Sequence, residues 1–560
     1  MSRSSPSLLA ALPLLLLLSD ALAAQAQPAE VVWADRWNQR FHRFVDLDGD
    51  GSFIDAGEVA LQLSPTAPES AAPLTMEVRD EGGVAVSYWL VEGTDLICRG
   101  IDVSGNGILS GAAEVKVFRD SGALDGSGWP RCMALTRDGA LWWESGGLIT
   151  QPHNGLSRLE DLNADGDAAD PGESVLMVDA NAGHVVEHDL GSSPITAWAL
   201  VAMAGAGNGV IAYADIDFAV YRFEDLDSDG DVTGPGESVL LLNTSTEYPA
   251  LPTNPDFLDG TLRSQDSQAG YPAPLRYLAS TLESGQRVFY FGTSVSPFQT
   301  AGTNLLGQGL NFLIFRGVDG NGDRDVNDAG EVKLHFNGSH TDGIQNLLAM
   351  RGLDALDGGT LYACGIKPYP VLGPGPNGNT WIHRFEDLNG DKDAMDAFEQ
   401  QYAIFDLQLF GPSPLFPLPP DFGNMMADPW GFSVRRLSPV TGLGGGTTGS
   451  AGAPTLSVTG SLAAGSPATI TLQQAPPNAP MLSWISVAST PVAALGGTLY
   501  PAPVLSQIGW VANGSGQLNL ALSWPPGLPP GLDLFLQFVI KDAGQSPSLL
   551  LSNALKLTTP

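Results

Sequence analysis

The chain has 560 residues, an apolar fraction of 43% and a formal net charge of −35. This length exceeds what one hydrophobic core organises, so at least two domains are expected. The 67 glycines and 42 prolines, against only 16% charged residues, favour short strands and tight turns over long amphipathic helices. The negative charge disfavours binding to nucleic acid.

Residues 1–26 have the pattern of a secretory signal peptide. Arg3 supplies positive charge, an apolar stretch runs from Leu8 to Leu18, and small residues follow as cleavage options. No later stretch reaches the roughly 18 uninterrupted apolar residues that a membrane helix needs. We therefore expect a secreted or cell-surface (extracellular) protein without membrane insertion.

Three cysteines, Cys98, Cys132 and Cys364, are too few for a disulfide framework. The sequence still allows a single disulfide bridge between Cys98 and Cys132.

One hairpin sequence occurs six times. The copies begin at Arg43 ("RFVDLDGDGSFIDAGEVALQL"), Arg99, Arg158, Arg222 ("RFEDLDSDGDVTGPGESVLLL"), Arg316 and Arg384. If the first aspartate of each loop is numbered 1, position 13 is always Glu and oxygen-bearing side chains fill positions 1, 3 and 5. Repetition at this scale is typical of a solenoid or a propeller.

The expected metal ligands are carboxylates and amides at loop positions 1, 3, 5, 10 and 13. They are Asp46, Asp48, Asp50, Asp55 and Glu58 in loop 1; Asp102, Asn106 and Glu114 in loop 2; Asp161, Asn163, Asp165, Asp170 and Glu173 in loop 3; Asp225, Asp227, Asp229 and Glu237 in loop 4; Asp319, Asn321, Asp323, Asp328 and Glu331 in loop 5; and Asp387, Asn389, Asp391, Asp396 and Glu399 in loop 6.

These six 13-residue loops hold 27 of the 61 acidic residues, with only Arg324 and Lys392 as cations, and so carry −25 of the −35. Oxygen ligands at alternate positions, a turn residue at position 6 and a closing Glu suit Ca²⁺; Mg²⁺ fits less well because it keeps its own waters. The alternative is an Asp/Asn/Gly-rich turn without an ion. Turn chemistry, however, gives no obvious reason for a Glu at position 13 of all six loops. Loop 2 is the weakest candidate for a metal site, because only Asp102 and Glu114 are charged there. Arg324 and Lys392 replace the turn glycine of loops 5 and 6 and add strain to them. We therefore do not expect all six loops to hold an ion.

The spacing resembles the DxDxDG calcium loops of EF-hands, dockerins and integrin-type propellers. The closing Glu falls at position 13, whereas the EF-hand places it at 12, so the resemblance concerns the ligands and not a helix-loop-helix fold. Apolar residues flank each loop in strand-like runs, so each loop is expected to cap a β-hairpin.

The first aspartates are 56, 59, 64, 94 and 68 residues apart, which leaves room for four strands per repeat. Such units resemble propeller blades. Copy 1 lacks the first strand of its four-stranded unit, and "NMMADPWGFSVRRL", which ends at Leu437, has no loop; this segment is expected to complete the first blade. Residues 30–437 are thus predicted to form a six-bladed β-propeller. The long connections at 246–275, 293–310, 366–380 and 408–423 are expected on the face opposite the loops.

Residues 438–453, rich in Gly, Ser and Thr, are predicted to be a flexible linker. Residues 454–560 carry few charges and alternate in polarity, which predicts an immunoglobulin-like β-sandwich. The fold class is therefore all-β. The chain resembles secreted bacterial six-bladed β-propellers that are followed by such an accessory module.

The arginine three residues before each loop is expected to pair with a carboxylate. "HVVEH", residues 184–188, matches the H-x-x-E-H string of inverzincin proteases, but no long helix is evident, so ordinary loop histidines are favoured over a zinc site. No catalytic residue is assigned.

The first hypothesis is a monomeric, secreted, calcium-binding propeller that binds a glycan or a protein. The alternative, suggested by the resemblance to six-bladed lactonases and phytases, is a calcium-dependent hydrolase of lactonase or phosphoesterase type. Convergent carboxylates, Asn or His in the central channel would favour the enzyme, and a channel lined with apolar and small residues would favour binding.

Overall fold

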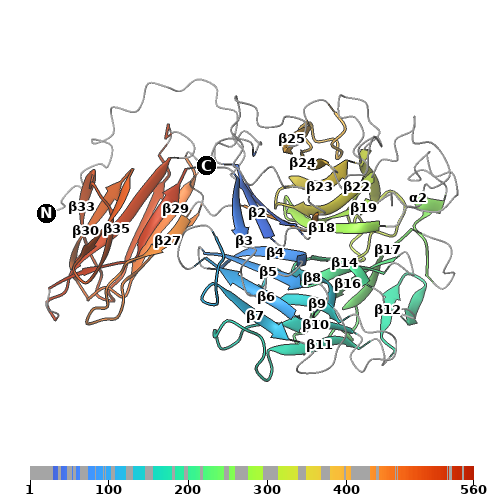
Figure 1. Cartoon of the computed structure of the whole chain (residues 1–560), viewed down its shortest axis with the longest axis horizontal. Coiled ribbons are helices and arrows are strands. Elements are labelled where there is room, and N and C mark those ends of the chain that lie inside the picture. Colours follow the sequence, from blue (N-terminus) through green and yellow to red (C-terminus); the bar gives the residue numbers. More distant parts are fainter. Residues whose placement is uncertain are drawn as a thin grey trace.

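The computed structural model is almost entirely β, with six similar sheets followed by a sandwich (Figure 1). It describes residues 29–35, 40–46, 53, 59–63, 73–81, 84–91, 94, 96–102, 108–120, 130–145, 155–179, 183–194, 200–214, 219–244, 251–258, 275–293, 313–337, 349–367, 379–396, 399–404, 429–436, 440–460, 462, 465–525, 527–528, 532–544 and 548–559.

Each of the six sheets, here called blades 1 to 6, is an antiparallel meander in which every Asp-rich loop joins the last two strands. From inner to outer strand they are β26 (Pro429–Arg436), β1 (Ala29–Asp35), β2 (Arg40–Val45) and β3 (Val59–Leu63) in blade 1; β4 (Pro73–Glu81), β5 (Val84–Val91), β6 (Leu96–Ile101) and β7 (Val115–Asp120) in blade 2; β8 (Pro130–Leu135), β9 (Leu141–Ser145), β10 (Gly155–Leu159) and β11 (Ser174–Asp179) in blade 3; β14 (Leu200–Gly205), β15 (Gly209–Ala214), β16 (Ala219–Glu224) and β17 (Ser238–Asn243) in blade 4; β18 (Leu275–Glu283), β19 (Gln286–Thr293), β20 (Leu313–Gly317) and β21 (Val332–Asn337) in blade 5; and β22 (Ala349–Ala355), β23 (Leu361–Lys367), β24 (Asn379–Phe385) and β25 (Gln400–Ile404) in blade 6.

The inner strands contact one another in cyclic order: β26 with β4, β4 with β8, β8 with β14, β14 with β18, β18 with β22, and β22 with β26. This is the arrangement of a six-bladed β-propeller. Blade 1 takes its inner strand from the end of the propeller segment, because β26 pairs antiparallel with β1, with Val31 opposite Val434. The expected completion of blade 1 by the segment before Leu437 is confirmed.

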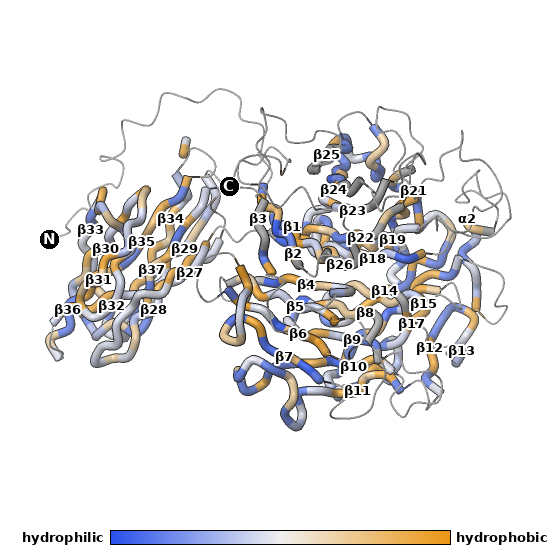
Figure 2. The backbone as a smooth tube through the Cα atoms, viewed as in Figure 1, coloured by the Kyte–Doolittle hydropathy of each residue, from blue (hydrophilic) through white to orange (hydrophobic). Residues whose placement is uncertain are grey.

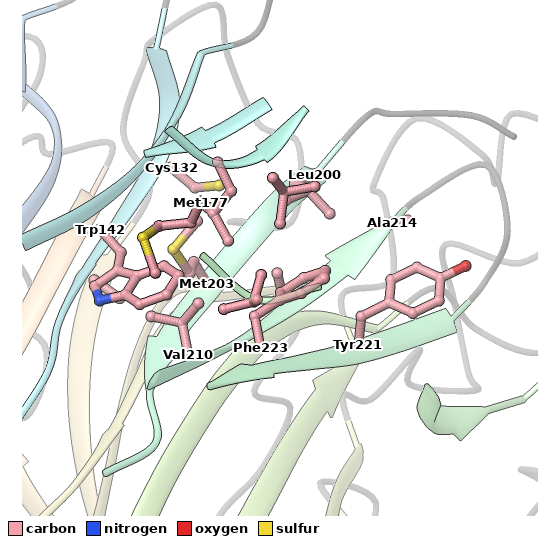
Figure 3. Packing of buried hydrophobic residues seen from close by; sticks show 14 of the residues in the cluster. Cys132, Trp142, Met177, Leu200, Met203, Val210, Ala214, Tyr221 and Phe223 are labelled. Atoms are coloured by element: carbon pink, nitrogen blue, oxygen red, sulfur yellow. The ribbon is translucent and has the colours of Figure 1, made fainter. Parts of the chain in front are cut away.

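The hydrophobic core lies in layers between neighbouring blades. Apolar residues run along the strands, seen as orange stretches in Figure 2. Each pair of neighbours shares one buried cluster, including blades 6 and 1. Figure 3 shows the layer between blades 3 and 4, where Trp142 of β9 faces Met203, Val210 and Phe223 of β14, β15 and β16. A strand buried on both faces favours the continuous apolar runs of "GVIAYA" in β15 and "SVLLLN" in β17.

The outer strand of every blade is irregular at the same place. Its pairing with the preceding strand skips the residue four positions after the loop Glu. The skipped residues are Gln62, Phe118, Met177, Leu241, His335 and Ala403. Such a β-bulge leaves one residue outside the ladder, so its carbonyl is available for another donor.

The next blade supplies that donor from position 8 of its Asp-rich loop. The bonds described are Leu109 N–H to Gln62, Ala168 N–H to Phe118 at 2.8 Å, Val326 N–H to Leu241 at 2.9 Å and Ala394 N–H to His335 at 2.9 Å. The side chain at position 8 is buried in all six loops, with at most 1% of its surface exposed. Each loop therefore holds its own hairpin and also fastens its blade to the blade before it.

A described insertion adds two strands to blade 4. Strands β12 (Val185–His188) and β13 (Gly191–Pro194) form a hairpin, and β12 pairs parallel with β17 at the outer edge. Helix α2 (Pro255–Leu258) lies in the connection that follows β17. Among the described residues, no helix has the length and apolar character to cross a membrane.

The C-terminal part is a sandwich of two sheets. One sheet has the order β27-β37-β35-β30-β33 with β36 beside β35, the other has the order β28-β29-β34, and β31 and β32 form a hairpin. The strands are β27 (Val440–Gly444), β28 (Thr455–Gly460), β29 (Pro467–Gln473), β30 (Pro480–Ser486), β31 (Ser489–Ala494), β32 (Gly497–Pro501), β33 (Ser506–Val511), β34 (Leu518–Ser523), β35 (Asp533–Lys541), β36 (Leu549–Leu551) and β37 (Ala554–Thr558). Leu472 of β29 and Phe538 of β35 are buried in one shared core, so the two sheets pack face to face.

The prediction that 438–453 is only a flexible linker is wrong for its first part. Strand β27 pairs antiparallel with β37, with Val440 opposite Leu557. Glycine and threonine composition favours flexibility in an isolated chain, but the open edge of β37 offers backbone partners that composition cannot reveal. The three cysteines are buried and none forms a disulfide, so the Cys98–Cys132 bridge is absent.

Phe53, at position 8 of loop 1, provides a test of this fastening. Its ring lies 6.2 Å from that of Phe44 in blade 1 and 6.3 Å from that of Tyr362 in blade 6. We expect Phe53→Ala to lower the free energy of unfolding by roughly 3–5 kcal/mol, because it leaves a cavity between blade 1 and blade 6. Urea unfolding measures this loss.

Leu388→Ala is the matched control, because Leu388 stands in loop 6 but is 60% exposed. A change within about 0.5 kcal/mol is expected for it. Equal effects of the two substitutions would contradict a structural role for position 8.

Candidate metal centres

The Asp-rich loops 3 to 6 share one backbone arrangement. The carboxylate at position 1 accepts the N–H of position 6. The side chains at positions 3, 5 and 7 each accept the N–H two residues further on. This succession of Asx turns explains why Asp and Asn occupy alternate positions. It also points the remaining carboxylate oxygens toward one another.

The closing Glu also holds the loop backbone. One oxygen of Glu237 accepts the N–H groups of Leu226 at 2.7 Å and Asp227 at 3.3 Å, and the other accepts that of Gly234 at 2.7 Å. Glu173 and Glu399 make the same three kinds of bond in loops 3 and 6. Hydrogen bonding within the turn therefore does explain why position 13 is Glu in all six loops, contrary to the expectation from sequence.

The two turn positions 4 and 6 have left-handed backbone conformations. Position 6 is Gly166 and Gly230 in loops 3 and 4, but Arg324 and Lys392 in loops 5 and 6, with φ of 81° and 82°. The expected strain at these two residues is present, since L-residues rarely adopt this conformation. In loops 5 and 6 the glycine stands instead at position 4, as Gly322 and Gly390.

Position 3 links the carboxylates when it is Asn. The amide nitrogen of Asn389 donates to Asp391 at 3.0 Å and to Asp396. Asn163 and Asn321 make equivalent bonds in loops 3 and 5. Loop 4 has an acid, Asp227, at this position and glycine at position 10, so the number of carboxylates is conserved while their placement changes.

Carboxylate oxygens converge within single loops. In loop 4, Asp225, Asp227 and Asp229 form one group with ligand atoms within 4.8 Å of one another, and Asp229, Asp231 and Glu237 form a second. In loop 6 the corresponding group is Asp391, Asp393 and Glu399. Two oxygens bound to one Ca²⁺ at 2.3–2.6 Å lie up to about 5 Å apart, so these groups fit that cation.

The acid at position 7 was not among the predicted ligands. Asp231 and Asp393 complete groups with the closing Glu; Asp167 and Asp325 are their counterparts in loops 3 and 5. The alternation of acids at positions 1, 3, 5 and 7 was the signal that could have identified them.

Loop 5 gains a carboxylate from another part of the chain. Asp189, in the turn between β12 and β13, places a ligand atom within 4.8 Å of those of Asp323 and Asp325. Burial, with the carboxylates of Asp323, Asp189 and Glu331 nearby, raises the pKa of Asp325 to about 7. In the same loop the buried Oε2 of Glu331 has no hydrogen-bond partner among the residues that the structure describes, and burial raises the pKa of Glu331. These groups would become ordinary charged ligands if a cation were bound among them.

The remaining predicted ligands are those of loops 1 and 2, and the structure describes only some of them. Asp48, Asp50, Asp55, Glu58 and Asn106 lie outside the described residues. Asp46 is buried, and in loop 2 Glu114 accepts the N–H of Ser110 at 2.9 Å. Of loop 1 the structure describes only Asp46 and Phe53, and of loop 2 only Asp102 and residues 108–114.

Two connections reach the Asp-rich loops, contrary to the expectation that they lie on the opposite face. Glu187, on β12, accepts the N–H of Gly236 in loop 4 at 3.0 Å. Asp256, in α2, accepts the N–H of Gly330 in loop 5 at 2.7 Å. Strand β12 pairs with the outer edge of β17, and Val326 of loop 5 donates to Leu241 of the same strand.

"HVVEH" is not a helical zinc motif. Residues 185–188 form strand β12, and each histidine has its own partner: His184 hydrogen-bonds with Ser238 at 2.7 Å and His188 with Ser193 at 2.9 Å.

The arginine before each loop pairs with a carboxylate in five blades. The pairs are Arg43 with Glu30, Arg158 with Asp138 and Glu160, Arg222 with Glu224, Arg316 with Glu283, and Arg384 with Glu386. The structural role expected for these residues is confirmed there. In blade 2, Arg99 donates to the hydroxyl of Tyr88 at 3.2 Å.

Two carboxylates converge on the inner strands. Asp354 of β22 accepts the N–H groups of Val434 at 2.7 Å and Ala355 at 2.8 Å. Burial raises the pKa of Asp354 to about 6. Burial, reinforced by the nearby Asp354, raises the pKa of Glu77 on β4 well above its usual range. The two groups behave as an interacting pair that holds a proton near neutral pH.

This pair predicts a pH dependence of stability in the metal-free chain. Because both pKa values are raised on folding, the folded state holds more protons than the unfolded state between about pH 4 and 6, so stability falls as pH rises. We expect Glu77→Gln to remove about 1–3 kcal/mol of the loss between pH 4.5 and 7. Urea unfolding in EDTA at the two pH values measures it. Glu160→Gln, at a partly exposed carboxylate, serves as the control and should keep the wild-type slope.

No protein-family model and no curated protein sequence matches this chain. Several solved structures are similar to it at low level. A putative 6-phosphogluconolactonase from Bacteroides fragilis NCTC 9343 has 11% identity and a TM-score of 0.32 over 74% of this chain and 100% of that one. A luciferin-regenerating enzyme has 10% identity and a TM-score of 0.31 over 61% and 84%.

The hydrazine synthase of Kuenenia stuttgartiensis has 10% identity and a TM-score of 0.30, over 57% of this chain and 64% of that one. The match thus spans less than two thirds of the hydrazine synthase chain. Scores this low assign no function. The propeller fold rests on the strand order and the blade contacts described above.

Proposed function

We propose that this chain is a secreted, calcium-binding β-propeller that acts as a binding and structural module for a glycan or a protein. The observation that carries the proposal is the convergence of carboxylate oxygens within loops that also fasten neighbouring blades. Asp229 belongs to both groups of loop 4, and Asp391, Asp393 and Glu399 form the group of loop 6.

Charge repulsion is the reason to expect a cation. Five carboxylates within 13 residues oppose compaction, and the backbone N–H groups that they accept only partly offset this repulsion. The residues that would hold the ion are the acids at positions 1, 3, 5 and 7 with the closing Glu. A bound Ca²⁺ supplies two positive charges among hard oxygen ligands.

The loops would transmit this stabilisation to the whole ring. Position 8 lies one residue beyond the last clustered Asp and inserts a buried side chain between two blades. In loop 5, contacts from Asp189 and Asp256 connect the same loop to two insertions. Calcium would therefore order both the blade contacts and the insertions, which are the proposed surface for a glycan or protein partner.

Calcium removal tests the proposal directly. We expect thermal unfolding of the mature chain in millimolar Ca²⁺ to occur at a clearly higher temperature than in EDTA, with four to six ions bound. Each site would contribute about 2.7 kcal/mol when the free ion is at 100 times its Kd. Calorimetry and a count of bound metal are the measurements; no shift and no bound metal would refute calcium binding.

A pair of substitutions separates specific sites from general acidity. Asp229→Asn should remove about one bound ion and the stabilisation that accompanies it. Asp533→Asn makes the same charge change in the C-terminal sandwich, where Asp533 pairs with Lys556, and should leave the count unchanged.

A calcium-dependent hydrolase of lactonase or phosphoesterase type is the second candidate function. The pair of Glu77 and Asp354 favours it, because two carboxyl groups with raised pKa values are suited to general acid and base work. Both groups lie on inner strands, but Asp354 is also held by two backbone N–H groups, which a structural role explains equally well.

Activity assays distinguish the two candidates. If the hydrolase proposal holds, a panel of lactones and phosphate esters will include a substrate whose turnover falls at least about 100-fold in Glu77→Gln while calcium-dependent melting is unchanged. No turnover across the panel would leave the binding function as the proposal.

A further inference from the structure

The C-terminal sandwich has an apolar groove on the outer face of its larger sheet. The groove has a volume of about 990 Å³, which suits a small ligand. Of the 14 described residues that line it, Lys541 is the one that carries a charge. Three of the large apolar side chains that line it are exposed, namely Leu482, Val511 and Leu549. Apolar surface that gathers in a hollow is typical of a ligand-binding groove.

Strand register places the charge at the end of the apolar face. Leu482 of β30 stands opposite Val539 of β35, whereas its neighbour Met481 belongs to the core of the sandwich. Lys541 follows Val539 by two residues and stands opposite Leu549 of β36. Because residues two apart in a strand share a face of the sheet, Lys541 lies on the same outer face as Leu482 and Val539.

A hairpin bounds the groove on the other side. Strand β32 contacts β30, β35, β36 and β37, so the hairpin of β31 and β32 lies across the same face. Leu495, in the turn of this hairpin, lines the groove. The side chain of Gln537 on β35 fixes the hairpin, because it accepts the N–H of Tyr500 at 3.1 Å and donates to the carbonyl of Thr498 at 3.0 Å. Four residues of extended strand, about 13 Å, separate Gln537 from Lys541.

Both acidic residues of the sandwich have partners other than Lys541. The sequence of this domain contains two acids, Asp533 and Asp542. Asp533 pairs with Lys556 at 2.9 Å. Asp542 is buried and accepts the N–H and the hydroxyl of Ser450, at 2.7 and 2.9 Å. Lys541 is therefore left without a carboxylate partner among the described residues of the sandwich.

We propose that this groove binds the anion of a medium-chain fatty acid, with the carboxylate at Lys541 and the alkyl chain along the apolar face toward the hairpin. Charge complementarity favours this occupant, because Lys541 gives the carboxylate a charge-assisted hydrogen bond while the chain and the groove remove apolar surface from water together. A glycan fits less well, since its hydroxyl groups would lose water without a hydrogen bond to replace it. The proposal goes beyond calcium binding and concerns a different domain.

Titration calorimetry on the full mature chain tests this with decanoate as the probe. The chain is loaded with Ca²⁺ and then transferred to buffer without free ion, because free Ca²⁺ precipitates fatty acids. We expect decanoate to bind, octanoate to bind about fifteenfold more weakly because it buries two fewer methylenes, and acetate not to bind. 1-Decanol has the same chain without the charge and should bind at least about tenfold more weakly than decanoate.

Two pairs of variants link binding to the groove. Lys541→Met removes the charge and keeps an apolar chain, so decanoate should then bind no better than 1-decanol. Lys556→Met, its control, removes the other lysine of the sandwich and should leave binding unchanged. Leu482→Asp places a carboxylate in the groove and should abolish binding. Leu505→Asp, its control, changes a leucine that is 61% exposed and is not part of the groove lining, so it should bind as the wild type does.

Absence of decanoate binding at about 1 mM, or equal affinity for decanoate and 1-decanol, would overturn the proposal. Wild-type affinity in Lys541→Met or Leu482→Asp, with both variants folded by circular dichroism, would overturn it as well. Sedimentation velocity detects a second copy as the occupant, and a wild-type dimer that Leu482→Asp dissociates would also contradict the proposal. Bound calcium is counted on the same samples, so a failure of the groove is distinguished from a failure of the loops.

Discussion

Hydrogen bonds between an Asp-rich loop and the bulge of the preceding outer strand, described for loops 2, 3, 5 and 6, connect neighbouring blades of this propeller. In the described part of the chain no strand ladder joins one blade to the next, so other contacts must hold the blades in place. The bulge frees one carbonyl, and the loop provides the N–H of position 8 together with a buried side chain, as Ala168 does against Phe118. The acidic residues are therefore fixed beside the core and not on free loops.

This placement has an electrostatic consequence. The loop carboxylates are hydrogen-bonded to backbone N–H groups, so the turns are satisfied as hydrogen-bonding units. Their charge is not removed, however, because an N–H group carries only a partial positive charge. Burial then makes the uncompensated charge more costly, which is expressed in the raised pKa of Asp325. A cation is the simplest partner for what remains.

Small differences among the repeats produce different local chemistry on one scaffold. Arg324 enters loop 5 at a glycine position and finds Glu224, whereas loop 3 keeps Gly166 and leaves a cleft that contains Lys116. Asp189 brings an insertion to loop 5. Because each interface between blades is a separate layer, such changes need not disturb the other interfaces.

Repeat spacing, apolar flanks and alternating acids were sufficient to predict an all-β propeller, its completion by the segment before Leu437, and the loops where acids gather, because these depend on local sequence period. The bulges, the role of position 8, the convergence of Asp189 with loop 5, the pair of Glu77 and Asp354, and strand β27 could not be read from sequence. Each of these arises from residues far apart in the chain, and only the packing of one sheet against another brings such residues together.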